Sequence, residues 1–166
     1  GEHAARWSSE TMEQVGDVHG RVYENAQAYV HTENIRQMLE RGEDPHSALI
    51  ERGRELGIQV YASVRMNDNH FNGAQIEDLE GLHHTELTRM RQEHPEWLLG
   101  DRTSEWFALS WDMSVPEVRQ HRLDHIRETC ERYDWDGVEL DWQRHAFHLP
   151  QDEAYRLRYV LTDLQR

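Results

Sequence analysis

The sequence predicts an α/β fold in which helices and strands alternate. The spacing of the hydrophobic residues changes several times between about 3.6 and 2, the periods of a helix and a strand. Each predicted strand also has one apolar face and one polar or charged face. The resulting order is helix, strand, helix, strand, helix, strand, helix, which indicates parallel strands joined by right-handed crossovers.

Two helices are predicted before the first strand. The first begins near Thr32 and ends at Gly42, because glycine commonly follows a helix end. The second begins with Asp44 as N-cap and Pro45 in the first helical position, and it ends at Gly57. The expected buried residues are Ile35, Met38 and Leu39 in the first helix, and Ala48, Leu49 and Leu56 in the second.

Three strands are predicted from the alternation of apolar and polar residues. They cover residues 58–67, 106–111 and 136–142. The side chains at the polar ends of the first and third strands are Arg65, Asn67, Glu139 and Asp141. Because the carboxyl ends of parallel strands meet at one edge of a sheet, we expect these side chains to share one site.

The segments after the first strand include a long connection over residues 68–104, rich in His, Asn, Asp and Gly, with a short helix near 86–93. A connection of this length is usually functional or disordered.

A further helix is predicted to start at the capping box from Ser114 to Glu117. Its expected apolar stripe is Leu123, Ile126, Cys130 and Tyr133. A last helix is predicted from about Asp152.

Strands that are polar on one face fit a closed (β/α) barrel better than an open doubly wound sheet, whose strands are apolar on both faces. In a barrel, the inward residues near the carboxyl strand ends form the active site. A full eight-stranded barrel takes about 250 residues. We therefore expect residues 1–166 to form a single incomplete barrel domain of three to four β/α units, which aggregates or partly unfolds when expressed alone. An open parallel α/β sheet is the alternative.

The composition excludes several classes of protein. Lys and Arg number 18 and Asp and Glu 32, giving a formal charge of −14, which argues against a nucleic-acid or anionic-membrane partner. The single cysteine, Cys130, excludes an internal disulfide framework. No apolar run reaches the roughly 18 to 20 residues of a membrane span. No cofactor is expected, since the sequence has no glycine-rich phosphate loop. Oligomeric state and localisation stay open.

Glu139 and Asp141 are the strongest candidates for catalysis. They are two residues apart on a strand, so their side chains point the same way with Cα atoms roughly 6.6 Å apart. Two neighbouring carboxylates repel each other, which raises the pKa of one of them. A raised pKa suits a general acid near neutral pH. The alternative is a carboxylate pair that is only neutralised by arginines, Arg65 among them.

A second set of residues is expected to bind substrate. The candidates are Arg65, Asn67, Asp68, His70, Trp111 and Arg144. Guanidinium and amide groups suit sugar hydroxyls or a carboxylate substituent, although Arg65 could serve only to neutralise the strand carboxylates. Trp111, at the end of the second strand, is the expected stacking platform for a sugar ring, whereas the more common role of a tryptophan is packing.

The chain has 12 histidines, with the densest groups at His83, His84, His145 and His148. None of them has the H-E-x-x-H or paired Cys/His spacing that marks a metal site. We therefore predict no metal site, and a metal-dependent hydrolase is kept as an alternative function.

The run Tyr133-Asp134-Trp135-Asp136-Gly137-Val138-Glu139-Leu140-Asp141-Trp142 resembles the fourth strand of glycoside-hydrolase barrels. The segments Ala62–Asp68, His94–Trp97 and Pro116–Arg119 fit the same pattern. Together, over roughly residues 33–150, they resemble a bacterial family-10-like glycoside-hydrolase barrel family. The resemblance implies a (β/α) barrel that cleaves glycosidic bonds in an oligo- or polysaccharide by carboxylate acid/base catalysis, a substrate class that a secreted or periplasmic protein would meet.

The comparison with chitinases fails at one position. Their strand reads D-x-x-D-x-D-x-E and ends in the glutamate that protonates the glycosidic oxygen, whereas this chain has Gln143 there. An amide cannot donate that proton, so Asp141 or Glu139 has to take the acid or base role.

Three functions stay open: a glycoside hydrolase, a carbohydrate-binding barrel that has lost catalysis, and a metal-dependent hydrolase. The sugar, the linkage and the second catalytic carboxylate are left open.

Overall fold

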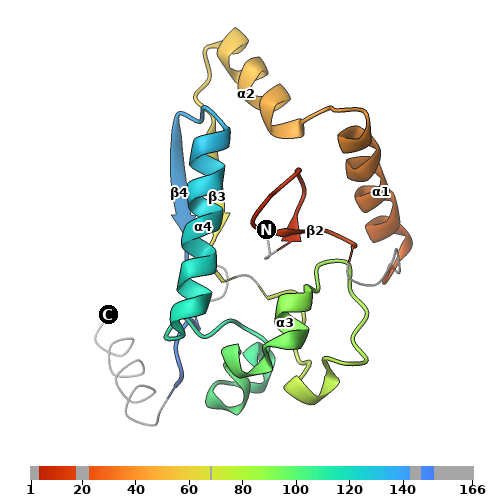
Figure 1. Cartoon of the computed structure of the whole chain (residues 1–166), viewed down its shortest axis with the longest axis vertical. Coiled ribbons are helices and arrows are strands. Elements are labelled where there is room, and N and C mark those ends of the chain that lie inside the picture. Colours follow the sequence, from red (N-terminus) through yellow and green to blue (C-terminus); the bar gives the residue numbers. More distant parts are fainter. Residues whose placement is uncertain (1–3, 18–22, 68, 143–146, 152–166) are drawn as a thin grey trace, which may run out of the picture.

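The computed structural model describes residues 4–17, 23–67, 69–142 and 147–151 (Figure 1). Within these residues it has four α-helices: α1 (Ala26–Glu40), α2 (Pro45–Leu56), α3 (Arg89–Glu93) and α4 (Pro116–Arg132). Its four strands are β1 (Ala4–Ala5), β2 (Glu13–Gln14), β3 (Tyr61–Arg65) and β4 (Gly137–Asp141). The predicted α/β class is confirmed. The described residues form two small parallel sheets, β1–β2 and β3–β4, and no closed barrel.

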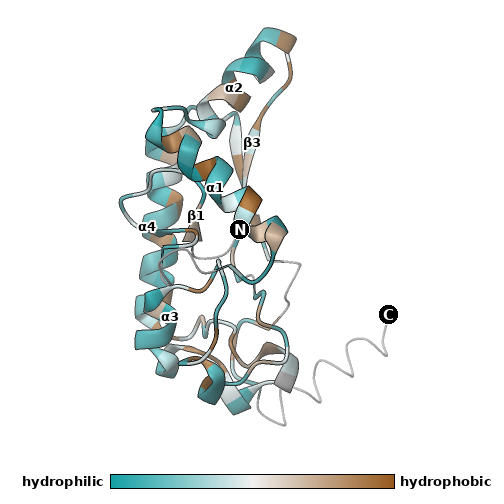
Figure 2. Cartoon of the chain, turned by 90° about the vertical axis from the view of Figure 1, so that its right-hand side faces the viewer, coloured by the Kyte–Doolittle hydropathy of each residue, from teal (hydrophilic) through white to brown (hydrophobic). Residues whose placement is uncertain are grey.

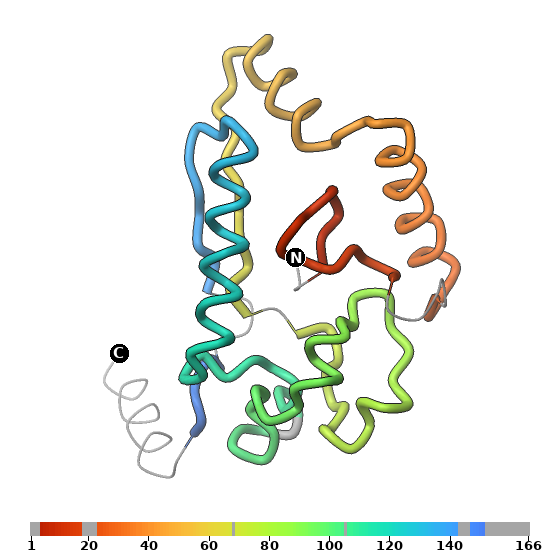
Figure 3. Tube along the Cα trace, in the orientation of Figure 1, coloured from red at the N-terminus to blue at the C-terminus, as the bar shows by residue number. Residues whose placement is uncertain are grey.

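The β3–β4 sheet is the main sheet of the described residues. The two strands are parallel over their whole length, from Tyr61 opposite Gly137 to Arg65 opposite Asp141. The ring of Tyr61 lies over Gly137, in the space that a Cβ there would occupy. The chain between the strands passes through a long connection and then α4, which overlaps both strands in the view of Figures 1 and 3. β3, α4 and β4 therefore form a βαβ unit.

The predicted strand over residues 106–111 is wrong. Glu105–Phe107 is a turn of 3-10 helix, and Trp111 makes a single antiparallel bridge to Leu98. The reason is burial: Leu109, Ser110 and Trp111 are completely inaccessible to solvent. A short apolar run of this kind has no period of its own, so its conformation is decided by the core around it.

The termini of α1 and α2 follow local capping chemistry. α1 begins six residues before the predicted Thr32, because Asn25 is its N-cap and accepts a 2.8 Å hydrogen bond from the backbone N–H of Ala28. The first turns expose Tyr29 and Val30 instead of burying an apolar stripe, so periodicity alone missed them. The predicted end at Gly42 is confirmed, since Gly42 has φ +73° and its N–H donates to the carbonyl of Leu39.

The bounds predicted for α2 are confirmed. Asp44 accepts from the N–H of His46 at 2.9 Å, and Gly57 ends the helix in the left-handed conformation. The face predicted to be buried is wrong, because Ala48, Leu49 and Leu56 are exposed. Ile50 and Gly53 are the buried residues instead. A Cβ on Gly53 would collide with Val60, so α2 lies against the chain that enters β3 through this bare position.

The face of α4 that is buried also differs from the prediction. Leu123 and Cys130 are exposed, and only Tyr133 of the expected stripe is buried. The buried residues of the helix are Val118, Arg122, His125 and Thr129. The predicted capping box is absent as well: Val115 occupies the N-cap without a side-chain hydrogen bond, and the Ser114 hydroxyl lies 2.6 Å from Asp112.

Two hydrophobic cores hold the described residues together. The larger lies within the connection between β3 and α4 and reaches onto α4 itself; its buried members are Phe71, Leu79, Leu87, Leu98, Leu109, Trp111, Met113 and Val118. The smaller joins the N-terminal segment to α2 and the end of α4 through Ala5, Trp7, Met12, Ile50 and Tyr133. Most residues of the helices are hydrophilic, with hydrophobic positions interspersed (Figure 2).

The long connection is ordered where it is described, and α3 with its N-cap Thr88 confirms the short helix predicted there. The helix predicted from Asp152 lies outside the described residues. Among the helices that the structure describes, none has the length and hydrophobicity needed to cross a bilayer.

Candidate functional site

The carboxyl ends of β3 and β4 bring together Arg65 and Asp141, two residues that the sequence placed in one site. They are direct neighbours in the strand register, and Arg65 Nε lies 4.0 Å from Asp141 Oδ2. Their side chains are 36% and 25% exposed, so both are accessible from solvent. The result is a guanidinium next to a carboxylate at the end of a parallel sheet, where α/β folds bind ligands.

Glu139 lies two residues before Asp141 on β4 and opposite Ser63 on β3. The alternation of a strand places both acidic side chains on one face of the sheet. On β3 the same face carries Tyr61 and Ser63, which are exposed, whereas Ala62 and Val64 on the other face are buried. The structure therefore places the two carboxylates on the open face of the sheet, with Glu139 exposed and Asp141 half-buried.

Asn67 has a structural position. It is 3% exposed, and its side-chain Nδ2 donates to the carbonyl of Trp111 at 2.8 Å and to that of Phe147 at 3.2 Å. Its Oδ1 accepts from the N–H of Trp111 at 3.0 Å. All of these bonds go to backbone groups, so Asn67 fastens the end of β3 to the connection. The amide is thereby used within the protein, and the predicted contact with a sugar does not fit this position.

Trp111 is a core residue. Its exposed fraction is 0%, and the guanidinium of the buried Arg91 lies 5.0 Å from the centre of its ring. A sugar-stacking platform needs an exposed ring face. The structure therefore assigns Trp111 to packing, the alternative given for it above, and the platform role does not fit.

His70, the remaining described candidate, belongs to a cluster that sequence reasoning missed. Its Nδ1 lies 3.5 Å from Oε2 of the buried Glu86. The other carboxylate oxygen of Glu86 contacts Arg6, whose Nε donates to His31 Nε2 at 3.1 Å. These residues come from the N-terminal segment, α1 and the connection after β3. Because Arg6 and Glu86 are 80 residues apart in sequence, no local motif could have joined them.

His84 completes this cluster from the other side of Glu86. Its Nδ1 accepts from the backbone N–H of Glu86 at 3.1 Å, and its Nε2 lies 3.7 Å from Glu24. Burial lowers the pKa of the His84 imidazole, although Glu24 and Glu86 act in the opposite direction. Burial alone would raise the pKa of Glu24, but hydrogen bonds such as those from Thr85 bring it below its usual value. His84 is therefore a neutral structural histidine.

Two predicted substrate-binding residues, Asp68 and Arg144, lie outside the described residues. Within the residues that the structure does describe, no group of three or more His, Cys, Asp and Glu side chains is arranged to hold a metal ion.

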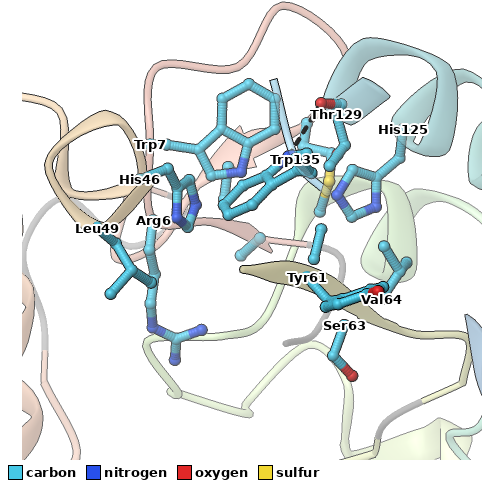
Figure 4. Close-up of a pocket in the computed structure, with 14 residues that line it drawn as sticks. Arg6, Trp7, His46, Leu49, Tyr61, Ser63, Val64, His125, Thr129 and Trp135 are labelled. Atoms are coloured by element: carbon cyan, nitrogen blue, oxygen red, sulfur yellow. Dashed lines mark hydrogen bonds between the residues drawn. The ribbon is translucent and has the colours of Figure 1, made fainter. Parts of the chain in front are cut away.

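A cavity of about 250 Å³ lies on the free side of β3, between the N-terminal segment, α2 and α4. Figure 4 shows Trp7, Trp135 and His46 gathered on one side of it and Ser63 and Val64 of β3 on the other. Trp135 donates through Nε1 to the carbonyl of Thr129 at 3.2 Å. The cavity is lined by the middle of β3 and not by the residues at its carboxyl end, so it is separate from the candidate site.

Neither a protein-family model nor a curated protein matches this chain. The resemblance to glycoside-hydrolase barrels therefore stays a prediction, and the site is interpreted from its own geometry.

Proposed function

We propose that the chain is part of a (β/α)-barrel glycoside hydrolase and that Asp141 and Glu139 are its catalytic carboxylates. The observation that carries the proposal is the parallel register of β3 and β4, which sets Arg65 beside Asp141 at the carboxyl end of the sheet. In (β/α) barrels the active site is built at this end from residues of several strands.

The βαβ unit supports the barrel as the architecture of the proposal. β3 and β4 are adjacent, parallel and connected through α4, which is the repeating unit of both a barrel and an open parallel sheet. The polar face made by Ser63, Arg65, Glu139 and Asp141 favours the barrel, because an open doubly wound sheet would cover this face with helices. The open parallel sheet stays the alternative architecture.

The chemistry follows from two carboxyl groups on one face of a strand. Glycoside hydrolysis needs one carboxyl group that gives a proton to the glycosidic oxygen and one base or nucleophile on the opposite side of the sugar. Asp141 is the better-placed catalytic group, because it is half-buried and next to Arg65. Glu139 lies two residues before Asp141 on the same face of β4 and is the second carboxylate of the proposal. Arg65 would also hold a sugar hydroxyl or carboxylate.

The test is the release of reducing ends from a panel of soluble glucans, xylans, mannans and chitin oligosaccharides. Asp141→Asn should lower turnover on a cleaved glycan by about 100-fold or more, the size of a general acid–base contribution. Asp101→Asn is the matched control, because it removes an exposed carboxylate from the connection. Unchanged far-UV and near-UV circular dichroism shows that both variants are folded. Near-normal turnover of a folded Asp141→Asn protein would refute the assignment.

A carbohydrate-binding barrel without catalysis is the second candidate, and Gln143 in place of an acid is the observation that favours it. It predicts saturable binding of a glycan from the same panel without any release of reducing ends. A cleaved product from wild-type protein would exclude it.

A further inference from the structure

The cavity beside β3 has no part in the proposed hydrolysis, and its shape suits a small ligand. Its volume is about 250 Å³. Pockets for drug-sized ligands occupy roughly 300 to 1,000 Å³, so this one has room for a single aromatic ring with small substituents. Four consecutive residues of β3, Tyr61–Val64, line it. Because successive side chains point to opposite faces of a sheet, the cavity is bounded by the edge of the strand and not by one face.

This edge of β3 presents backbone hydrogen-bonding groups to the cavity. The carbonyl of Val60 and the N–H of Met66 both bond to the β4 side. The N–H and C=O groups of the alternate residues between them, Tyr61 and Ser63, therefore point to the opposite edge. No strand among the described residues pairs with that edge. It can thus pair with a ligand that carries both a donor and an acceptor.

The second polar group of the cavity is the hydroxyl of Thr129 on α4. Thr129 is 7% exposed, and its Oγ1 has no hydrogen-bond partner among the described residues. Its backbone carbonyl, in contrast, accepts from the indole N–H of Trp135 at 3.2 Å (Figure 4). Buried polar atoms of native proteins almost always have a partner. The hydroxyl therefore marks a position for a hydrogen-bonding group of a bound molecule.

The walls of the cavity are aromatic. Trp7, His46 and Trp135 lie together on one side of it (Figure 4). The ring centres of Trp7 and His46 are 6.2 Å apart, and those of His46 and Trp135 are 5.4 Å apart. Burial lowers the pKa of His46, and it lowers that of His125 to about 3, so both imidazoles are neutral at pH 7. Such walls suit a planar, uncharged ring.

Arg6 is the charged residue among the described residues that line the cavity. Its guanidinium contacts the carboxylate of Glu86, and its Nε donates to His31 at 3.1 Å. Figure 4 shows this guanidinium directed away from the indoles of Trp7 and Trp135. A charged ligand would lose its hydration in the cavity without gaining a counter-charge, so an uncharged ligand is favoured.

We propose that this cavity binds a small, uncharged aromatic molecule with hydrogen-bonding groups on its ring. The ring lies against Trp7 and Trp135. Its polar groups bond to the backbone of Ser63 at the edge of β3 and to the hydroxyl of Thr129. An extended peptide would use the strand edge alone and would leave the aromatic walls and the hydroxyl unexplained. The proposal is independent of the proposed hydrolase, because the cavity shares no lining residue with the strand-end site.

The probe is 4-hydroxybenzamide, which carries a hydroxyl and a carboxamide on one ring. We expect saturable 1:1 binding to the full chain in isothermal titration calorimetry at pH 7. In assigned proton–nitrogen-15 NMR spectra, the resonances that move should include the backbone N–H groups of Ser63 and Thr129 and the indole N–H of Trp135. A lack of binding, or binding that leaves these resonances in place, would overturn the proposal.

A charged analogue tests whether the ligand has to be neutral. In 4-hydroxybenzoate a carboxylate replaces the carboxamide at nearly the same shape. It should bind at least about 10-fold more weakly than the amide, because the cavity offers it no counter-charge. Equal or tighter binding of the benzoate would show that Arg6 is available to a ligand, and the proposal would fail.

Thr129→Val tests the hydroxyl, since valine keeps the shape of the side chain. It should weaken the binding of 4-hydroxybenzamide about 3- to 10-fold, the contribution of one hydrogen bond. Thr103→Val is the matched control and should bind like the wild-type protein. The hydroxyl of Thr103 is also buried without a partner among the described residues, but Thr103 does not line the cavity.

Circular dichroism shows whether the two variants are folded. Wild-type affinity in folded Thr129→Val protein would refute the site. If Thr129→Val does not fold, the comparison of the amide with the benzoate still decides. None of these measurements uses a glycan, so a chain that cleaves nothing can still confirm the cavity, and an active hydrolase can still lack this ligand site.

Discussion

The connection that follows β3 and the β3–β4 sheet itself differ sharply in how they are packed. In the connection, Leu98, Leu109 and Trp111 are at most 1% exposed. On the sheet, Tyr61 is 55% exposed and Leu140 45% exposed. The long connection has its own hydrophobic core, whereas the short strands leave large apolar side chains in solvent.

This difference assigns the two regions different roles. The connection acts as the scaffold, because Asn67 ties the end of β3 to the backbone of the buried Trp111. It also carries the buried Glu86 that contacts His70. The sheet contributes an accessible face with Arg65 and Asp141. At binding and catalytic sites, a rigid, well-packed scaffold commonly holds accessible polar side chains in position.

The largest expected effect is the loss of the scaffold core. Trp111→Ala removes a fully buried indole and should lower the free energy of unfolding by about 3 to 5 kcal/mol. Trp142→Ala is the matched control, since Trp142 follows β4 and is 43% exposed, and it should cost less than about 1 kcal/mol. Urea unfolding followed by circular dichroism measures both. Equal losses of unfolding free energy in the two variants would show that the connection and the sheet do not differ in how tightly they are packed.

Acidification should have the next largest effect, through histidines that pack between α4 and the N-terminal segment. Burial, assisted by Arg122, lowers the pKa of His121 to about 4 and that of His125 to about 3. In the unfolded chain both titrate near 6.5, so below that pH the unfolded state binds more protons. Their contribution to stability is complete well above pH 6.5 and falls progressively toward pH 3, by about 4 kcal/mol for the two together at pH 5.

Unfolding measured at pH 7 and pH 5 checks this prediction. His125→Gln cannot take up a proton at this position, so the variant should lose less stability over the interval than the wild-type protein does. The same loss in both proteins would show that His125 is not the source of the acid sensitivity.

Asn67→Ala should have an intermediate effect. It leaves the N–H and the carbonyl of Trp111 without their side-chain partner in a buried place, at a cost of about 2 kcal/mol. The expected result in urea unfolding is a lower midpoint with an unchanged slope. Asn72→Ala, which changes an exposed asparagine of the same connection, should leave the midpoint in place. If Asn67→Ala unfolds like the wild-type protein, the tie between β3 and Trp111 has no energetic importance.

The features that the sequence predicted correctly depend on local chemistry. Asp44, Pro45 and Gly57 bound α2 through caps that involve only neighbouring residues. β3 and β4 follow from alternation over a few positions, and with them the neighbourhood of Arg65 and Asp141.

The features that it missed depend on contacts between distant segments. α4 buries Arg122 and His125 while Leu123 and Cys130 stay exposed, because His125 stacks on Trp7 from the N-terminal segment. Glu86 reads as an ordinary polar residue until the fold brings Arg6 and His70 to it. Trp111 was placed at a strand end as a platform, whereas the core around it fixes it as packing.

The smallest expected effect concerns Leu140, an exposed apolar residue on the face of the sheet that also carries Val64. Leu140 is 45% exposed in β4, so Leu140→Ser removes little buried area and should change the free energy of unfolding by less than about 0.5 kcal/mol. Val64, its neighbour in the register, is 5% exposed, and Val64→Ser should cost several times more because it places an unpaired hydroxyl in the core. Urea unfolding of the two variants compares adjacent positions of one sheet. A cost for Leu140→Ser as large as that for Val64→Ser would mean that Leu140 is covered in solution. The β3–β4 sheet would then be as closely packed at this position as the connection is.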